Sequence, residues 1–573
     1  MHGLFRLDGA AVDAADAAAW DMPLANPSEA AVARGVDTAA PWMIHRSDAG
    51  DQITILAGNI DDAADLAGRL SLRADIGMAD LARAAYRHFG SSASVEVLGE
   101  WTLLHWEPEG RLTLMASAAR RDRVFYAVSN ARCAISPDLF QMARLGWIGR
   151  SIDETGLLFH LGRAHLRSQT ADRTMLDGVR QLLPAQAVVI TRDGVRASQA
   201  EALTPQPRWY GTFEDACEAG EAALIKAVRA RIAGSPAPAV LLSGGLDSSL
   251  LAWAAAEQLR PGQRLHLLTS AAPPGSGLPD ETEFAEIVAR TLGLECQRVY
   301  PGADADPFRR PVRVMRDANG PLLSNRQPLT DAFQATGRDV GATVLLNGCY
   351  GEYTLTGRSE FPTWRTRAGA LRDRLRRTIV AERPGEGFHV RLSPKRLQRL
   401  PEHIRAALAA PDPPPAIRKP GDPWGYHVGM ERALGHANEF FGGALRMEFP
   451  YRDVQLLRLF AGMPRRFFVA DGFDRAPARR VLAGRLPDSI RLRTRGMPAS
   501  PDHGVRLKNY AAKARTRIDA FRRAEVDEWF DLDWLDQTLA SVAERGPSGV
   551  IEANNVQLTA INAELLTWWR MGD

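Results

Sequence analysis

This 573-residue sequence has few cysteines, no long apolar run and almost no lysine, and each shortage excludes some classes of protein or site. The four cysteines, Cys133, Cys217, Cys296 and Cys349, are far apart, with no C-x-x-C pair to indicate a zinc or redox site. No run of about 18 or more uncharged apolar residues occurs, and no basic N-terminal stretch precedes a hydrophobic segment. We therefore expect reduced, unpaired cysteines and a cytoplasmic protein.

The charge balance is close to neutral, because the formal net charge is only +3. No basic region large enough to indicate binding to nucleic acid or an anionic membrane is visible. Only five of the 71 Lys and Arg residues are lysines, so arginine supplies the other cationic groups. A chain of this length exceeds the usual size of one hydrophobic core, which predicts two or more domains.

The N-terminal part reads mainly as β-strands with short helices between them. Alternating or aromatic-rich runs at residues 51–60, 94–117 and 123–129 are separated by Gly, Pro and Asp turns. The stretch 77–90 has the apolar spacing of an amphipathic helix that ends on glycine. These patterns predict an α+β sandwich.

The pattern changes after the proline-rich stretch "TPQPRWYGT", residues 204–212. Strands at 238–244, 264–270 and 342–348 then alternate with helices, which predicts a parallel sheet. We expect ligands at the carboxyl ends of these strands. The predicted domains are residues 1–205 and 206–573. A second proline-rich stretch, 411–425, is a surface loop or a border of the substrate channel.

The segment "LLSGGLDSSLL" has the features of a phosphate-binding loop between a strand and a helix. Glycines let the backbone approach an anion, and successive N–H groups and the positive end of the helix then bind phosphate oxygens. Asp247 fits such a loop only if it faces Mg²⁺ that is shared with the phosphates. The residues expected to bind nucleotide here are Leu242, Ser243, Gly244, Gly245, Leu246, Asp247, Ser248 and Ser249.

The loop contains no lysine, although the Walker loop needs one for transfer of the γ-phosphate. The pattern S-G-G-x-D-S-S resembles instead the pyrophosphate loop of the ATP pyrophosphatase superfamily. That resemblance implies attack of a carboxylate on the α-phosphorus of ATP, giving an acyl-adenylate and pyrophosphate. The alternative is an ordinary glycine-rich turn.

Several segments in the same order resemble asparagine synthetases. They are "MHGLFRLDG", "LAGNIDDAADLAGRL", "LPDETEFAEIVARTLGLE", "TVLLNGCYGEYTLTG", "MEFPYRDVQLLRLFAGMP" and "RRVLAGRLPDSIRLRTRG". The resemblance covers nearly the whole chain. It implies an α+β glutaminase-like (Ntn-type) sandwich followed by an α/β parallel-sheet ATP-pyrophosphatase domain.

The start of the chain departs from that family. Glutamine-dependent members have a nucleophilic cysteine after the initial methionine, and here the residue is His2, which would also hinder removal of the methionine. We expect a degenerate amidotransferase domain without glutaminase activity, so the substrate itself supplies the amine. β-Lactam synthetases and lasso peptide cyclases resemble this arrangement, and the "RLRTRG" segment and the chain length favour the cyclases.

The family pattern also suggests residues outside the first loop. Aligned on "NG", Glu352 stands where the family has a metal-binding aspartate, so Glu352 and Asp247 are the expected Mg²⁺ ligands. Tyr350 is a candidate for contact with the adenylate or the amine, although a tyrosine after a strand is more often a packing residue. Ser270 and Gly348 complete the expected nucleotide site.

The family has a C-terminal lysine that stabilises charge near the acyl-adenylate, and this segment offers only arginines. Arg493 or Arg495 is the candidate replacement; neither can act as a base, because arginine stays protonated. Lys508 lies too far along the chain to match. A surface arginine cluster is the alternative.

These patterns predict an ATP- and Mg²⁺-dependent ligase that joins the N-terminal amine of a precursor peptide to an Asp or Glu side chain, forming a macrolactam. By the resemblance, its partners are the precursor peptide, a leader peptidase and a leader-binding protein. A β-lactam synthetase-like or other amide ligase is the alternative enzyme. An inactive homologue that binds a peptide or nucleotide is the alternative without catalysis, and an active glutamine-dependent synthetase is the least favoured.

Overall fold

The structure is a computed structural model that describes most of the chain. The described residues are 1–22, 31–34, 44–49, 52–120, 123–162, 172–200, 211–302, 304–310, 320–322, 324–357, 388–409, 445–494, 496–497 and 499–571. No helix in these ranges is long and apolar enough to cross a membrane.

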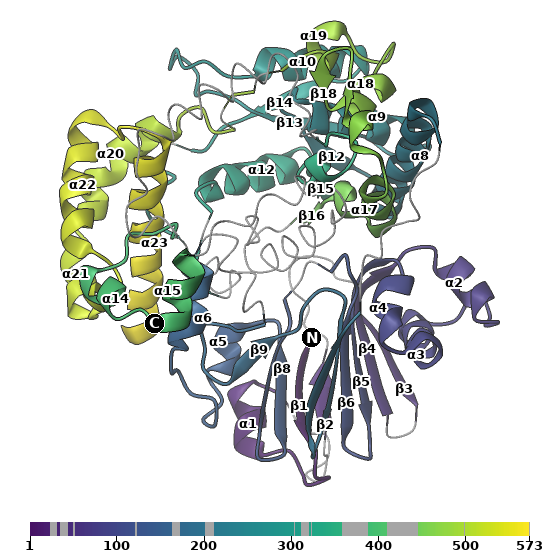
Figure 1. The fold of residues 1–573 in the computed structure, drawn as a ribbon, viewed down its shortest axis with the longest axis vertical. Coiled ribbons are helices and arrows are strands. Elements are labelled where there is room, and N and C mark those ends of the chain that lie inside the picture. The colour runs from purple at the N-terminus through teal and green to yellow at the C-terminus, as the bar shows by residue number, and fades with distance from the viewer. Residues whose placement is uncertain are drawn as a thin grey trace.

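The N-terminal domain contains two antiparallel sheets that pack face to face (Figure 1). One has the strand order β2-β1-β8-β7-β9 and the other the order β11-β10-β6-β5-β4-β3. The strands are β1 (His2–Arg6), β2 (Ala31–Arg34), β3 (Ile44–Ala49), β4 (Gln52–Ile60), β5 (Gly99–Glu107), β6 (Arg111–Ala116), β7 (Phe125–Ser129), β8 (Arg132–Ser136), β9 (Val179–Gln181), β10 (Gln186–Thr191) and β11 (Gly194–Gln199).

Alternation of side chains along these strands gives each sheet an inner and an outer apolar face. Phe5, Leu104 and Val188 belong to the buried cluster between the sheets. Leu103, one residue along from Leu104, packs instead under helices on the outer face of its sheet. Those helices are α2 (Ala63–Arg69), α3 (Met78–Phe89) and α4 (Ala93–Glu96), and α1 (Ala14–Ala19), α5 (Leu139–Met142) and α6 (Glu154–Leu161) cover the other sheet.

The second domain is built on a parallel sheet of order β14-β13-β12-β15-β16. Its strands are β12 (Pro238–Leu241), β13 (His266–Ser270), β14 (Cys296–Val299), β15 (Val344–Leu346) and β16 (Arg446–Glu448). Val240 and Leu346 pack with helices on one face, whereas Ala239 and Leu345 pack with α12 (Gln327–Asp339) on the other. The helices opposite α12 are α8 (Phe213–Ile232), α9 (Leu246–Glu257), α10 (Thr282–Thr291), α17 (Val454–Ala461) and α18 (Ala476–Val481).

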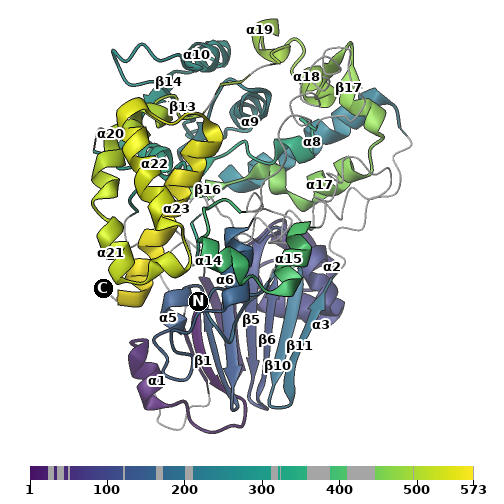
Figure 2. The ribbon, with the colours of Figure 1, turned by 60° about the vertical axis from the view of Figure 1, so that its left-hand side comes forward.

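The C-terminal helices pack beside the N-terminal domain (Figure 2). They are α20 (His503–Arg515), α21 (Ile518–Arg523), α22 (Leu532–Arg545) and α23 (Val550–Met571), and α14 (Pro394–Gln398) and α15 (Glu402–Ala409) lie against them. Phe140 of α5 contacts Trp568 and Trp569 of α23, with ring centroids 4.7 and 5.2 Å apart. One buried apolar cluster therefore contains residues of both domains.

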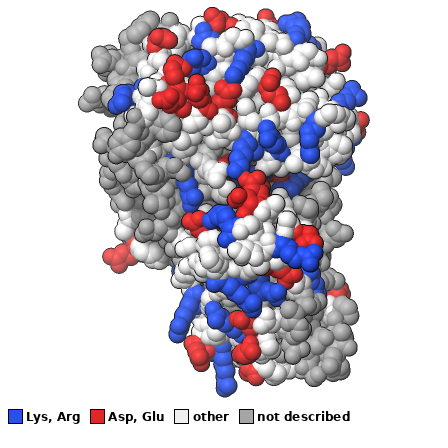
Figure 3. Space-filling view, turned by 90° about the vertical axis from the view of Figure 1, so that its right-hand side faces the viewer, with Lys and Arg blue, Asp and Glu red and all other residues white. Residues whose placement is uncertain are grey.

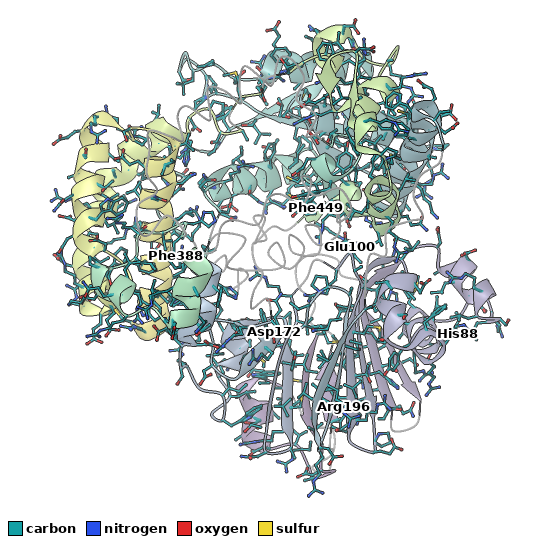
Figure 4. The ribbon with its side chains drawn as sticks, in the orientation of Figure 1. His88, Glu100, Asp172, Arg196, Phe388 and Phe449 are labelled. Atoms are coloured by element: carbon teal, nitrogen blue, oxygen red, sulfur yellow. The ribbon has the colours of Figure 1, made fainter. Side chains whose placement is uncertain are left out.

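A buried group of charges forms a second junction between the domains. Arg231 of α8 lies 2.8 Å from the carboxylate of Asp61, and its Nε lies 3.5 Å from Glu448 and 3.8 Å from Glu100. Each of these four side chains is at most 9% exposed. Figure 4 labels Glu100 at the end of the sandwich that faces Phe449 of the second domain.

Several sequence predictions agree with these elements. The helix expected at 77–90 is α3 (Met78–Phe89), which Gly77 and Gly90 cap at its two ends. The three predicted parallel strands are β12, β13 and β15, and none of the four cysteines, all of which the structure describes, forms a disulfide. The prediction of β-structure for 94–117 is wrong for its first residues, because these belong to α4 and β5 begins only at Gly99.

Other expectations fall on residues that the structure does not describe. The predicted domain boundary between residues 205 and 206 and the proline-rich stretch 411–425 both lie outside the described residues. On the face drawn in Figure 3, positive and negative side chains are interspersed over the described residues. This pattern agrees with the nearly neutral charge of the chain.

Candidate active site

A pocket of about 320 Å³ lies at the carboxyl edge of the parallel sheet. It is lined by the last residues of β12 and β13, by the loops after β12 and β15, and by residues of α9, α12 and the segment before α20. Its lining residues are Leu241, Leu242, Ser243, Asp247, Ser248, Thr269, Ser270, Glu281, Arg326, Leu329, Thr330, Phe333, Asn347, Gly348, Cys349, Glu352, Ala499 and Pro501. Ligands of open α/β sheets bind at this edge.

The loop after β12 is held by its own hydroxyl groups and by a close approach to α10. Ser243 Oγ and Ser248 Oγ are 3.1 Å apart, and Ser248 Oγ accepts the N–H of Ser243 at 3.1 Å. Gly244 has φ of +69°, and a Cβ there would lie 2.5 Å from Cβ of Phe284. Gly245 is the N-cap of α9 and makes no side-chain capping hydrogen bond, so the positive end of the helix faces the loop.

The carboxylate of Asp247 has two partners from distant parts of the chain. Thr356 donates its hydroxyl to Oδ1, and Arg475 lies 3.2 Å from Oδ2. Gly351 packs directly against the same carboxylate. The hydroxyl of Tyr451 donates to the Asp247 carbonyl oxygen at 2.8 Å, and burial, with a contribution from the Asp247 charge, raises the pKa of that phenol. Asp247 is therefore held in one orientation beside the pocket.

The loop after β15 forms the neighbouring wall. Asn347 donates its N–H to the carbonyl oxygen of Glu448 at 2.8 Å, and its side-chain oxygen accepts the N–H of Cys349 at 2.9 Å. A Cβ at Gly348 would lie 3.1 Å from the Ser248 nitrogen, so glycine lets this loop meet the start of α9. Glu352 follows in a short 3₁₀ turn, and its exposed side chain lines the pocket.

Arg493 supports the first loop from outside the pocket. It pairs with Glu281, donates to the carbonyl oxygen of Gly244 at 3.2 Å, and lies over the Phe284 ring at 3.9 Å from its centroid. Asp280, beside Glu281, accepts N–H groups of Ala272 and Thr282. Burial alone would raise the pKa of Asp280, but its hydrogen bonds hold that pKa below the usual value.

A family model for asparagine synthase matches residues 219–414 and 443–570, which is more than half of the chain. The chain belongs to the asparagine synthase family. The match covers β12 to β16, the pocket at their edge and nearly all of the C-terminal helices.

Two curated fungal proteins are similar to part of this asparagine synthase family member. Amidase chyE of Penicillium rubens is 24% identical over 297 residues, covering 45% of this chain and 40% of the relative. Amidase chry2 of Gibberella zeae is 25% identical over 253 residues, covering 39% of this chain and 34% of the relative. The chain thus matches less than half the length of these relatives.

Two solved structures match over a longer part of the chain at low similarity. The glutamine phosphoribosylpyrophosphate amidotransferase of B. subtilis, complexed with ADP and GMP, is 10% identical over 61% of this chain and 75% of its own, with a TM-score of 0.23. The structure of the allosteric regulatory enzyme of purine biosynthesis is 11% identical, covering 58% of this chain and 60% of its own, with a TM-score of 0.19. Scores this low support no argument about the fold.

The pocket brings together many of the residues expected from the sequence. Seven of them line it: Leu242, Ser243, Asp247, Ser248, Ser270, Gly348 and Glu352. Gly244, Gly245 and Leu246 shape the loop or its helix without lining the pocket. Tyr350 packs against Phe449, with ring centroids 5.5 Å apart, and does not line the pocket.

Two other expected residues do not line the pocket, and a third is not described by the structure. Ser249 is fully buried, and its hydroxyl has no hydrogen-bond partner among the described residues. Arg493 lies behind the loop, as described above. Arg495 lies outside the described residues.

Four residues beside the site are not among those predicted from the sequence. Glu281 pairs with Arg493 and accepts the N–H of Met497. Arg475 and Arg326 lie outside the segments that resemble asparagine synthetases, and Thr356 lies inside one of them without a predicted role. The available hint for Arg326 was its place directly before an amphipathic helix that leads into β15.

The chemistry of the donor set fits Mg²⁺. Asp247 and Glu352 offer carboxylate oxygens at one pocket, and Mg²⁺ prefers oxygen ligands. The described ranges contain no group of three or more His, Cys, Asp or Glu side chains that could hold a metal ion. Such a sparse protein set suits an ion that also takes ligands from substrate phosphates and water.

The position of the family's nucleophilic cysteine is occupied by a packed histidine. The His2 ring is 9% exposed, its Nδ1 lies 3.0 Å from the Ser136 hydroxyl, and it meets Trp20 edge-on at 5.5 Å. The side chain is part of the interior of the N-terminal domain.

Proposed function

We propose that the protein is an ATP- and Mg²⁺-dependent amide ligase that forms a macrolactam in a peptide. It activates an Asp or Glu side chain as the acyl-adenylate, and the N-terminal amine of the same peptide then attacks. Membership of the asparagine synthase family supports the ligase chemistry. The curated relatives named as amidases are also associated, by name, with amide chemistry.

The observation that carries the proposal is the shared pocket of the two loops. Ser243 and Ser248 follow β12, Glu352 follows β15, and Asp247 lies between them at the start of α9. The helix start and the hydroxyls suit the β- and γ-phosphates, and the carboxylates suit Mg²⁺. ATP whose β- and γ-phosphates are bound in this way would present its α-phosphorus to a nucleophile in the pocket.

The reaction balances without a base from the loop. A carboxylate oxygen forms a bond to the α-phosphorus while the bond to the bridging oxygen of pyrophosphate breaks. The amine nitrogen then forms a bond to the acyl carbon, the acyl–oxygen bond to AMP breaks, and the amine proton passes to phosphate or water. Mg²⁺, when bound, neutralises the charge on the phosphates. The protein holds both ends of the peptide together, which makes the second step effectively unimolecular.

The packed His2 supports an amine that comes from the substrate. An N-terminal glutaminase uses a thiolate or hydroxyl nucleophile at this position, and a buried imidazole bonded to Ser136 offers neither. The N-terminal sandwich then serves as a structural domain of Ntn type. A leader peptidase and a leader-binding protein are the partners that this function requires.

The test is ATP–pyrophosphate exchange with purified protein and synthetic peptides that carry one Asp or Glu at successive positions. We expect exchange that requires the acidic residue, with a product that has lost one water by mass spectrometry. Asp247→Asn is expected to abolish exchange, whereas Asp339→Asn, at the distant end of α12, is the matched control. Exchange with small β-amino acids alone would indicate a β-lactam synthetase-like enzyme. No exchange with any acid, despite nucleotide binding, would favour a binding protein.

A further inference from the structure

Arg326 lines the pocket but has no role in the reaction proposed above. It lies at the N-cap of α12, its side chain is exposed and lines the pocket, and its guanidinium has no hydrogen bond or ion pair with any described residue. The other arginines beside the site differ in this respect. Arg475 is paired with Asp247, and Arg493 with Glu281.

Arg326 differs in the sign of its charge from the other charged residues that line the pocket. Asp247, Glu281 and Glu352 all line the pocket, and Arg326 is its one cationic lining residue among those that the structure describes. Arg475 and Arg493 offset the charges of Asp247 and Glu281, but a carboxylate that enters the pocket still meets the negative phosphates of ATP and the acidic Glu352. It therefore needs a cation of its own, and arginine pairs with carboxylates through two parallel hydrogen bonds.

The two faces of the sheet separate Arg326 from the phosphate loop. α9 packs with Val240 and Leu346 on one face, whereas α12 packs with Ala239 and Leu345 on the other. Arg326 thus approaches the sheet edge from the side opposite the start of α9. A group held by Arg326 faces the phosphates across the edge and does not compete with them for the same donors.

The face of α12 that carries Arg326 also fits a side chain. Leu329, Thr330 and Phe333 line the pocket with it, at the i, i+3, i+4 and i+7 spacing of one helical face. The apolar part of this face suits the methylene groups of an Asp or Glu side chain. Arg326 lies at the end of that face, where the carboxylate would be.

We propose that Arg326 binds the carboxylate that becomes adenylated and directs it at the α-phosphorus. The inference rests on the proposed function, because it assigns the acid-binding residue of that same site. Arg326 takes no part in bond making; it holds the oxygen pair until one oxygen attacks, and it then releases the neutral acyl group.

The experiment separates nucleotide binding from carboxylate binding. The probes are the non-hydrolysable analogue AMPCPP with Mg²⁺, and N-acetyl-aspartate amide with N-acetyl-asparagine amide as its uncharged counterpart. Calorimetry with the full chain measures each dissociation constant for wild type, Arg326→Gln, Arg326→Lys and Arg338→Gln. Arg338 lies in the last turn of the same helix and is exposed, so it controls for the change of charge.

With AMPCPP bound, we expect Arg326→Gln to weaken binding of the aspartate probe by about 10–100-fold, the range for a lost charge-assisted hydrogen bond. Arg326→Lys should recover part of the loss, and Arg338→Gln should behave as wild type. The AMPCPP constant should stay within twofold in all variants, and the asparagine probe should not distinguish them. Equal binding of the aspartate probe by wild type and Arg326→Gln, including equally weak binding, overturns the inference. A matching loss of AMPCPP affinity also overturns it, because Arg326 then contacts phosphate. If the wild-type protein does not bind AMPCPP, the result contradicts the proposed function and not the role of Arg326.

Discussion

Replacing Gly244 by alanine tests whether the phosphate loop depends on a close approach to α10. The new Cβ would lie 2.5 Å from Cβ of Phe284, 2.8 Å from its carbonyl carbon and 2.9 Å from the nitrogen of Ala285. None of these atoms can rotate away, so the loop or α10 must move. Overpacking of this kind costs about 1–3 kcal/mol, and the left-handed φ of +69° adds about 1–2 kcal/mol for a residue with a Cβ.

Gly262→Ala separates these two effects. Gly262 has φ of +87°, but a Cβ there would meet nothing within 4 Å. We expect urea unfolding to show a loss of about 2–5 kcal/mol for Gly244→Ala and about 1–2 kcal/mol for Gly262→Ala. Pyrophosphate exchange should fall sharply only in Gly244→Ala. Equal stability of the two variants, with exchange retained in both, would refute the close-approach argument.

Three further predictions test the site, the N-terminal domain and the domain junction. Ser248→Ala should slow exchange by about 2–10-fold, since it removes a hydroxyl of the loop, whereas Ser249→Ala should leave the rate unchanged; equal losses would contradict the assignment. Burial lowers the pKa of His105 to about 4, so acidification from pH 6.5 to 4 should cost up to ~3 kcal/mol, because only the unfolded chain takes up the proton. In His105→Gln, the free energy of unfolding in urea should not show this loss between pH 6.5 and 4. An equal loss in His105→Gln would exclude His105 as its cause. Arg231→Met should destabilise the protein by about 3–5 kcal/mol in thermal and urea unfolding, because three buried acids lose the guanidinium beside them, whereas the exposed Arg229→Met should change little.

The local parts of the site could be predicted because they depend on neighbouring residues. Gly77 and Gly90 flank an amphipathic stretch, so the limits of α3 follow from the sequence. The loop 243–248 lies between a buried strand and a helix, and its glycines and hydroxyls carry the phosphate-binding pattern. Both cases use contacts within a few residues.

The partners that complete the site could not be predicted in this way. Arg475 reaches Asp247 across 228 residues of sequence, from an N-cap in the left-handed conformation that arginine rarely adopts. Arg326 lines the same pocket as the loop only because α12 covers the opposite face of the sheet. Such contacts depend on the packing of whole elements, and a periodic pattern in one element does not specify its neighbour.

The apolar cluster shared by α5, α6 and α23 has a consequence for synthesis on the ribosome. Leu157 and Leu158 of α6 pack in the same cluster as Leu565 and Leu566 of α23, about 400 residues later in the chain. At about 5–20 residues per second, translation of that interval lasts on the order of 20–80 seconds. During this time the outer face of the N-terminal sandwich lacks its partner helices. The nascent chain is therefore a client for chaperones that shield apolar surface, and ribosome-bound chains ending before residue 550 should recruit them more strongly than chains that include α23.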